Sequence, residues 1–170
     1  HSIREFGALF VWRPEIFYLT ARLLAACLYL AGLYPLIRCG NALGGTTALW
    51  AAGLLAASPT LIVSAHSAKP DSLLFFLAAW AWWLALCYAQ EGRRRHLVLC
   101  GAAVGLCVST QYVAAPLALL VPSAWLARRM SAPNRARPGD RGPRPRDAFL
   151  ALGAVPAAFF AGSPFILLDW

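Results

Sequence analysis

The chain has 170 residues, of which 60% are hydrophobic and 13% are charged, and its formal net charge is +8. Soluble domains carry about 45–50% apolar and about 25% charged residues, so this composition excludes an ordinary soluble domain and is typical of a membrane protein. The positive charge does not indicate nucleic-acid binding, because the arginines cluster between apolar runs without interleaved aromatic residues. Since the first residue is His1 and not methionine, we expect an internal piece of a longer protein.

Apolar runs in chain order predict membrane helices, because about 20 mostly apolar residues span a bilayer. These runs cover residues 16–37, 46–65, 72–89, 97–126 and 148–168. Residues 1–15 mix aromatic and charged side chains, which suits an interfacial segment on the outer side. Residues 127–147 are rich in Arg and Pro, and they predict a flexible cytoplasmic loop between the helices of 16–126 and the last helix in 148–170.

The run at 97–126 is too long for one ordinary crossing. Basic clusters flank it at 93–95 and 128–146, and basic loops belong on the cytoplasmic side. Polar residues interrupt the run near 109–112, so we expect a helical hairpin that turns there. The alternative is one long tilted helix, which would leave one basic loop on the wrong side. The predicted fold is an all-α, polytopic transmembrane bundle with five to six membrane segments.

This topology predicts a site on the non-cytoplasmic face, because the few polar groups of the chain converge there. The segments that reach this face are 1–15, the corner at 66–71, the turn at 109–112 and the end at 163–170.

The corner at this face supplies positive charge. Lys69 and His66 would present it to a phosphate at the membrane surface, although Lys69 also suits an interfacial anchor. Arg22, about two turns into the first run, either snorkels to the interface or grips phosphate oxygens with its planar guanidinium. Pro70 and Asp71 suit the first turn of a helix, and Asp71 would alternatively orient a base or a polar substrate.

Weaker signals complete the candidate site. Gln111 and Tyr112 lie at the expected turn, where an aromatic residue is also a common membrane anchor. We expect no metal site, because the histidines are scattered and no cysteines form a CxxC pair. The "GAAVG" at 101–105 is typical of close helix packing.

The order of these features resembles the membrane-embedded glycosyltransferases of the GT-C class. More narrowly, it is similar to the bacterial branch related to protein O-mannosyltransferases and lipid A aminoarabinose transferases, often called the RgtA/B/C/D-like or PMT-2 domain. The matching stretches are "FYLTARLLAACLYLAGLYPLIRCGNALGG", "LWAAGLLAASPTLIVSAHSAKPDSLLFFLAAWAWW", "LVLCGAAVGLCVSTQYVAAPLALLVPSAWL" and "FFAGSPFILLD".

The resemblance implies an inverting glycosyltransferase in the bacterial inner membrane, with its active site on the non-cytoplasmic side. Such enzymes move a sugar from a polyprenyl-phosphate donor to a glycan, lipid or protein acceptor, and no cofactor is expected. Lys69, His66 and Arg22 would bind the donor phosphate, while Asp71, Gln111 and Tyr112 would support the site.

The chain departs from the family pattern at two of these places. His66 stands where related mannosyltransferases carry an arginine before the aspartate, and Gln111 stands where many relatives carry a lysine. The family's acidic catalytic motif is expected upstream of His1. Two other functions stay open: a multispanning transporter, and a membrane scaffold without catalytic activity.

Overall fold

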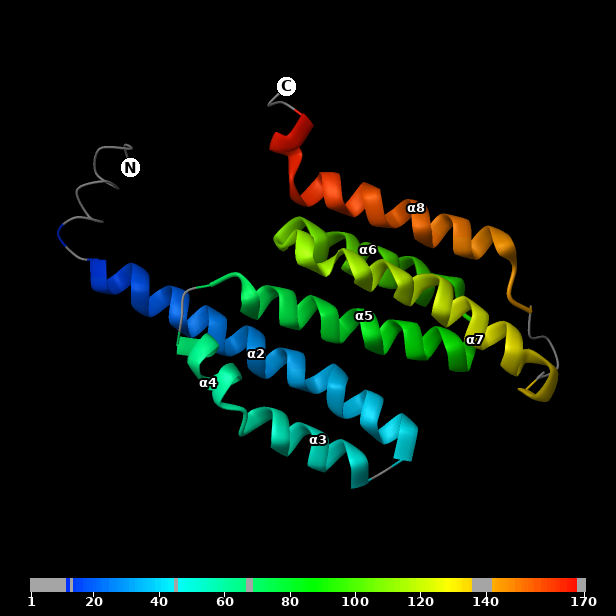
Figure 1. Cartoon of the computed structure of the whole chain (residues 1–170), viewed down its shortest axis with the longest axis horizontal. Helices are drawn as coiled ribbons and strands as arrows, with labels where there is room; N and C mark the ends of the chain where they lie inside the picture. Colours follow the sequence, from blue (N-terminus) through cyan, green and yellow to red (C-terminus); the bar gives the residue numbers. More distant parts are fainter. Residues whose placement is uncertain (1–11, 13, 45, 67–68, 136–141, 168–170) are drawn as a thin grey trace.

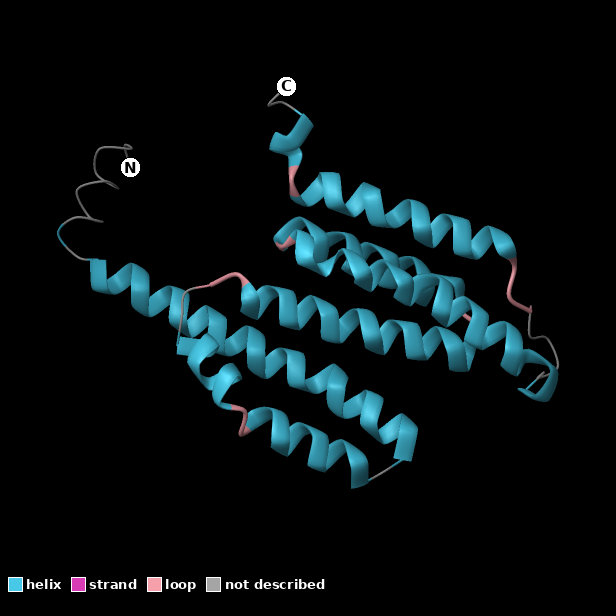
Figure 2. Ribbon diagram, viewed as in Figure 1, coloured by secondary structure: helices cyan, strands magenta, loops and turns pink. Residues whose placement is uncertain are grey.

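The computed structural model describes residues 12, 14–44, 46–66, 69–135 and 142–167. Helices make up all of the regular structure within these residues, as Figures 1 and 2 show. The predicted all-α class is therefore confirmed. The expected interfacial segment lies almost entirely outside the described residues.

The first half of the chain forms four helices (Figure 1): α2 (Pro14–Gly44), α3 (Thr46–Ala56), α4 (Pro59–His66) and α5 (Asp71–Glu91). The single membrane helix predicted over 46–65 is wrong, because the chain breaks between α3 and α4 at Ser58. The reason lies in Pro59, which has no N–H to continue the helix and disfavours helical backbone at the residue before it.

The run at 97–126 forms the predicted hairpin. Helix α6 (Arg94–Thr110) ends at Gln111, whose extended backbone has φ −151° and ψ 125°. A 3-10 helix, η1 (Tyr112–Leu119), then leads into α7 (Leu120–Arg135). The turn near 109–112 is confirmed, and the alternative of one long tilted helix is excluded.

The described parts of the basic segment 127–147 include helix, which differs from the predicted loop. Helix α7 continues to Arg135, and α8 (Pro145–Gly162) begins before the predicted loop ends. The buried Arg128 explains part of this difference: its Nη1 donates to the backbone oxygen of Gln90 at 3.0 Å. Carbonyl groups in the last turn of a helix lack partners within that helix, so Arg128 fixes α7 against the end of α5.

The "GAAVG" stretch packs α6 against α8, as the sequence predicted. A Cβ atom at Gly101 would collide with the backbone oxygen of Ala151, and one at Gly105 with that of Val155. The second contact lies four residues later than the first on both helices. Helices α6 and α8 therefore run parallel, side by side (Figure 1). After α8, the short 3-10 helix η2 (Pro164–Leu167) ends the described chain.

Many large apolar side chains are exposed along the bundle. Large side chains on α2 are well exposed, including Leu19 at 62% and Leu30 at 68%. Within the described residues, α2 and α5 are each long and apolar enough to cross a membrane. These features fit a helical membrane protein, and the five to six crossings stay a prediction.

Candidate functional site

Polar groups from three separate parts of the chain meet at one end of the bundle, at the left in Figure 1. Gln111, just after α6, donates a hydrogen bond from Nε2 to Oδ1 of Asp71 at 2.6 Å, across 40 residues of sequence. Beside it, the Oγ atoms of Ser109 and Ser163 lie 2.6 Å apart and share a hydrogen bond. We call the end defined by Lys69, Asp71, Ser109, Gln111 and Ser163 the polar end.

Asp71 occupies its place because α5 begins there, as the sequence predicted. The backbone oxygen of Pro70 accepts hydrogen bonds from the amides of Leu73 and Leu74, both at 3.1 Å. The Ser72 hydroxyl donates to the backbone oxygen of Lys69 at 3.4 Å. These local bonds fix the first turn of the helix, and Asp71 is left half-buried within reach of the turn after α6.

Lys69 lies at the start of this bonded corner. It is exposed, and its ammonium group makes no ion pair with any described residue, including Asp71 two positions later. The structure therefore does not form the acid–base pair that the proximity of the two residues in the sequence suggests.

Arg22 lies at the same end of the bundle. Helices α2 and α5 run parallel, as two ring contacts show: Tyr29 with Phe75 at 5.2 Å, and Tyr34 with Trp80 at 6.2 Å. In this register Arg22 lies about one helical turn beyond the level of Asp71. Its side chain is exposed, so both Arg22 and Lys69 offer positive charge at the polar end.

The other two predicted residues have different outcomes. Tyr112 is 67% exposed, and its ring centroid lies 6.2 Å from that of Phe159 on α8. Adjacent residues of the turn thus connect α6 to two neighbours: Gln111 to α5, and Tyr112 to α8. His66 ends α4, and its side chain lies outside the described part of the structure.

The serine pair was not predicted from the sequence. The sequence placed the turn at 109–112 and the end at 163–170 on one face, but gave no reason to pair Ser109 with Ser163. The signal was weak: each serine simply falls at the end of an apolar helix. The pair depends on the parallel packing of α6 and α8, which brings their C-terminal ends together.

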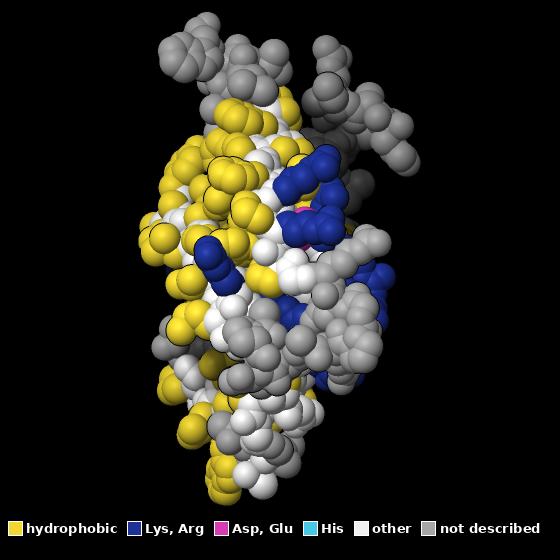
Figure 3. Space-filling view, turned by 90° about the vertical axis from the view of Figure 1, so that its right-hand side faces the viewer, with side chains coloured by type: hydrophobic (Ala, Val, Ile, Leu, Met, Phe, Trp, Pro, Cys, Tyr) yellow, Lys and Arg dark blue, Asp and Glu magenta, His cyan; other side chains and the backbone are white. Residues whose placement is uncertain are grey.

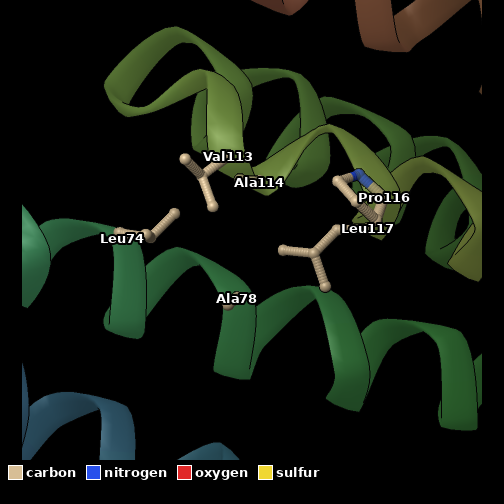
Figure 4. A pocket seen from close by; sticks show the side chains of 6 residues that line it. All are labelled: Leu74, Ala78, Val113, Ala114, Pro116 and Leu117. Carbon is tan, nitrogen blue, oxygen red and sulfur yellow. The ribbon is translucent and has the colours of Figure 1, made fainter.

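An apolar cavity of about 400 Å³ opens directly beside the polar end, between α5 and η1. Figure 4 shows side chains from the two elements lining it: Leu74, Ala78, Val113, Ala114, Pro116 and Leu117. Leu74 lies one turn after Asp71, and Val113 lies two residues after Gln111. Polar and apolar binding groups are therefore neighbours, which suits an amphipathic ligand.

The polar end brings several kinds of polar group together. It offers exposed cations, a carboxylate held by an amide, and paired hydroxyl groups. Within the described residues, no group of three His, Cys, Asp or Glu side chains is placed to hold a metal ion.

Comparison with protein families gives a match. A family model described as dolichyl-phosphate-mannose-protein mannosyltransferase matches residues 6–133, which is more than half of the chain and includes α2 through most of α7. Neither the curated proteins nor the solved structures give a match to this chain.

Proposed function

Because the chain belongs to the dolichyl-phosphate-mannose-protein mannosyltransferase family, a family of membrane glycosyltransferases, we propose that it moves a sugar from a polyprenyl-phosphate donor to an acceptor hydroxyl. The reaction would take place at the polar end, on the non-cytoplasmic face of the membrane. One observation carries this proposal: the hydrogen bond from Gln111 to Asp71 joins two distant segments beside exposed cations and an apolar cavity.

The cations would bind the donor phosphate. When the glycosidic bond breaks, the polyprenyl phosphate leaves with negative charge, and positioned cations stabilise that charge. Lys69 and Arg22 are exposed and lie at the polar end, so they are assigned this role. His66 is proposed as a third contact, since it ends the helix that leads into this corner.

The remaining predicted residues would shape the site. The bond between Gln111 and Asp71 holds the start of α5 next to the turn after α6, and so fixes the backbone that carries Lys69. Tyr112 would support the same turn from the side of α8. The polyprenyl chain would leave the phosphate along the apolar cavity between α5 and η1.

Asp71 is not assigned as the general base. Its Oδ1 already accepts a short hydrogen bond from Gln111, which favours a positioning role. A carboxylate that takes the proton of the acceptor hydroxyl is still required, and we assign it to no described residue. The acceptor would be a glycan, a lipid or a protein.

The proposal favours an enzyme over a transporter for two reasons. The family is a transferase family, and the polar groups gather at one end of the bundle. Transporter sites instead lie near the middle of the membrane, at broken helices related by internal repeats.

The test measures sugar transfer from a polyprenyl-phosphate donor in membranes that contain the full-length protein. We expect Lys69→Ala to lower kcat/KM by about 10- to 100-fold, because a hydrogen bond to a charged group contributes about 1.5–3 kcal/mol. Lys69→Arg should retain most of the activity, since it keeps the charge.

The matched control is Arg93→Ala, which removes one exposed positive charge at the opposite end of the bundle and should leave transfer unchanged. Full activity in Lys69→Ala would overturn the role of Lys69. Absence of transfer by the wild-type protein, together with substrate counterflow in proteoliposomes, would overturn the proposed function in favour of a transporter.

A further inference from the structure

The end of the bundle opposite the polar end is strongly basic. Figure 3 looks onto this end and shows Lys and Arg side chains gathered on one side of it. The turn from α5 to α6, the middle of α7 and the start of α8 meet here. The exposed arginines that they contribute are Arg93, Arg94, Arg95, Arg129, Arg144 and Arg146.

Among the described residues, acidic side chains pair with two of these arginines. Arg93 pairs with Glu91 at 3.1 Å, and Arg94 lies 3.9 Å from Asp147. Burial lowers the pKa of the His96 imidazole below its ordinary value. The other four arginines have no acidic partner among the described residues, and we call them the arginine patch: Arg95, Arg129, Arg144 and Arg146.

Exposed apolar side chains lie within one helical turn of the arginine patch. Residues three or four apart on a helix share a face, so each of these side chains lies beside an arginine. The pairs are Arg95 with Leu99 (52% exposed), Arg129 with Leu126 (50%) and Arg146 with Phe149 (74%). Each pair offers a cation next to an apolar surface.

Trp125 holds the patch together across two helices. Its indole Nε1 donates to the backbone oxygen of Arg144 at 3.2 Å, which ties α7 to the residue before α8. The guanidinium of Arg129 lies 5.4 Å from the centre of a Trp125 ring. Tryptophan is enriched at membrane interfaces, where one side of the ring is apolar and the other meets water.

We propose that the arginine patch binds the head groups of anionic phospholipids. The phosphate would contact the guanidinium groups, and the acyl chains would lie along the apolar side chains one turn away. Basic clusters next to membrane helices attract anionic lipids in this way. The apolar side chains beside the arginines argue against a soluble polyanion as the ligand, because such a ligand has no apolar part to contact them. This inference does not depend on the sugar-transfer reaction.

The test compares two lipids on the purified full-length protein. Mixed micelles containing equal amounts of phosphatidylglycerol and phosphatidylcholine are analysed by native mass spectrometry, which counts the bound lipids. We expect the wild type to prefer phosphatidylglycerol. Combining Arg129→Gln, Arg144→Gln and Arg146→Gln should lower that preference at least about fivefold.

Replacement of the same three residues by lysine is the matched control, and it should retain most of the preference because it keeps the charge. Thermal unfolding in zwitterionic detergent checks that the variants are folded. If the triple glutamine variant does not fold, Arg129→Gln and Arg144→Gln are measured singly, and each should lower the preference.

Several results would overturn the proposal. One is equal binding of the two lipids by the wild type, and another is an unchanged preference in a folded glutamine variant. A third is equally strong competition by inorganic phosphate or by RNA, which would assign the patch to a soluble anion.

Discussion

The pair of Asp71 and Gln111 shows how single residues organise the polar end. A half-buried carboxylate is costly unless a donor satisfies it, and the Gln111 amide provides that donor at 2.6 Å. Because the amide is neutral, this hydrogen bond adds no positive charge to the turn. Within the described residues of this end, Lys69 and Arg22 are the exposed cationic side chains.

Gln111→Ala tests the contribution of this bond. It removes the donor to Asp71, and we expect the free energy of unfolding to fall by about 1 kcal/mol. Thermal or denaturant unfolding of the purified protein measures this loss. The KM for the donor should rise as well, since the corner that carries Lys69 loses one of its supports.

Thr110→Ala is the neighbouring control, because its hydroxyl donates only within α6, to the backbone oxygen of Leu106 at 2.9 Å. A double-mutant cycle with Asp71→Ala gives the pairwise energy. Strictly additive losses from Asp71→Ala and Gln111→Ala would show that the two side chains do not interact.

At the scale of elements, the packing of α6 on α8 determines where the polar end forms. Glycines on α6 let the backbones approach closely, because Gly101 and Gly105 lie directly against carbonyl groups of α8. The parallel direction of the two helices then brings Ser109 and Ser163 together at their ends. Widening this contact should separate the serines as well as weaken the bundle.

Gly101→Ala tests this contact. The added methyl group collides with the backbone of Ala151, which cannot move aside as a flexible side chain would. We expect the free energy of unfolding to fall by about 1–3 kcal/mol, as in other overpacked interiors, with a lower midpoint in thermal unfolding.

Gly153→Ala is the control on the same pair of helices, since nothing lies within 4 Å of its added Cβ atom. That variant should be neutral or up to about 1 kcal/mol more stable, because alanine favours helix. Equal destabilisation by both substitutions would contradict close packing at Gly101.

The features that the sequence predicted correctly depend on neighbours in the chain. Pro70 and Asp71 start a helix by local geometry, and the polar residues near 109–112 stop one. The break at Ser58 was missed because the apolar character continues across it, although Pro59 was a local signal.

The features that the sequence missed depend on distant neighbours. In the sequence, Arg128 resembles any other residue of a basic loop. Its partner is a backbone carbonyl group of α5, which lies 38 residues earlier in the chain. The serine pair likewise requires the parallel packing of two helices. The convergence of Asp71 and Gln111 was foreseen only as a shared face, since the predicted topology placed both residues on one side but gave no contact between them.

At the scale of the whole molecule, the structure separates two kinds of polar surface. Helix α5 has 21 residues, which gives a length of about 30 Å, similar to the hydrocarbon core of a bilayer. It begins at the polar end and ends beside the arginines, and α6 returns from the arginines to the polar end. A chain arranged in this way should expose Lys69 and Arg95 on opposite sides of a membrane.

Cysteine labelling tests this arrangement in the full-length protein. Lys69→Cys and Arg95→Cys are made separately and treated with a membrane-impermeant maleimide, first in intact spheroplasts and then in inverted vesicles. We expect position 69 to react in spheroplasts and position 95 in inverted vesicles, because basic segments remain on the cytoplasmic side. Gly142→Cys, another exposed position close to the arginines, should react like position 95.

The natural cysteines allow this experiment with little background. Cys87, Cys100 and Cys107 are buried, and Cys27 lies on an apolar helix. Replacing Cys27 and Cys39 by serine should therefore remove most of the remaining reactivity toward the maleimide. Labelling of positions 69 and 95 from the same side would contradict the separation of the two ends across a membrane. Opposite labelling with position 69 on the cytoplasmic side would keep that separation but reverse the side proposed for sugar transfer.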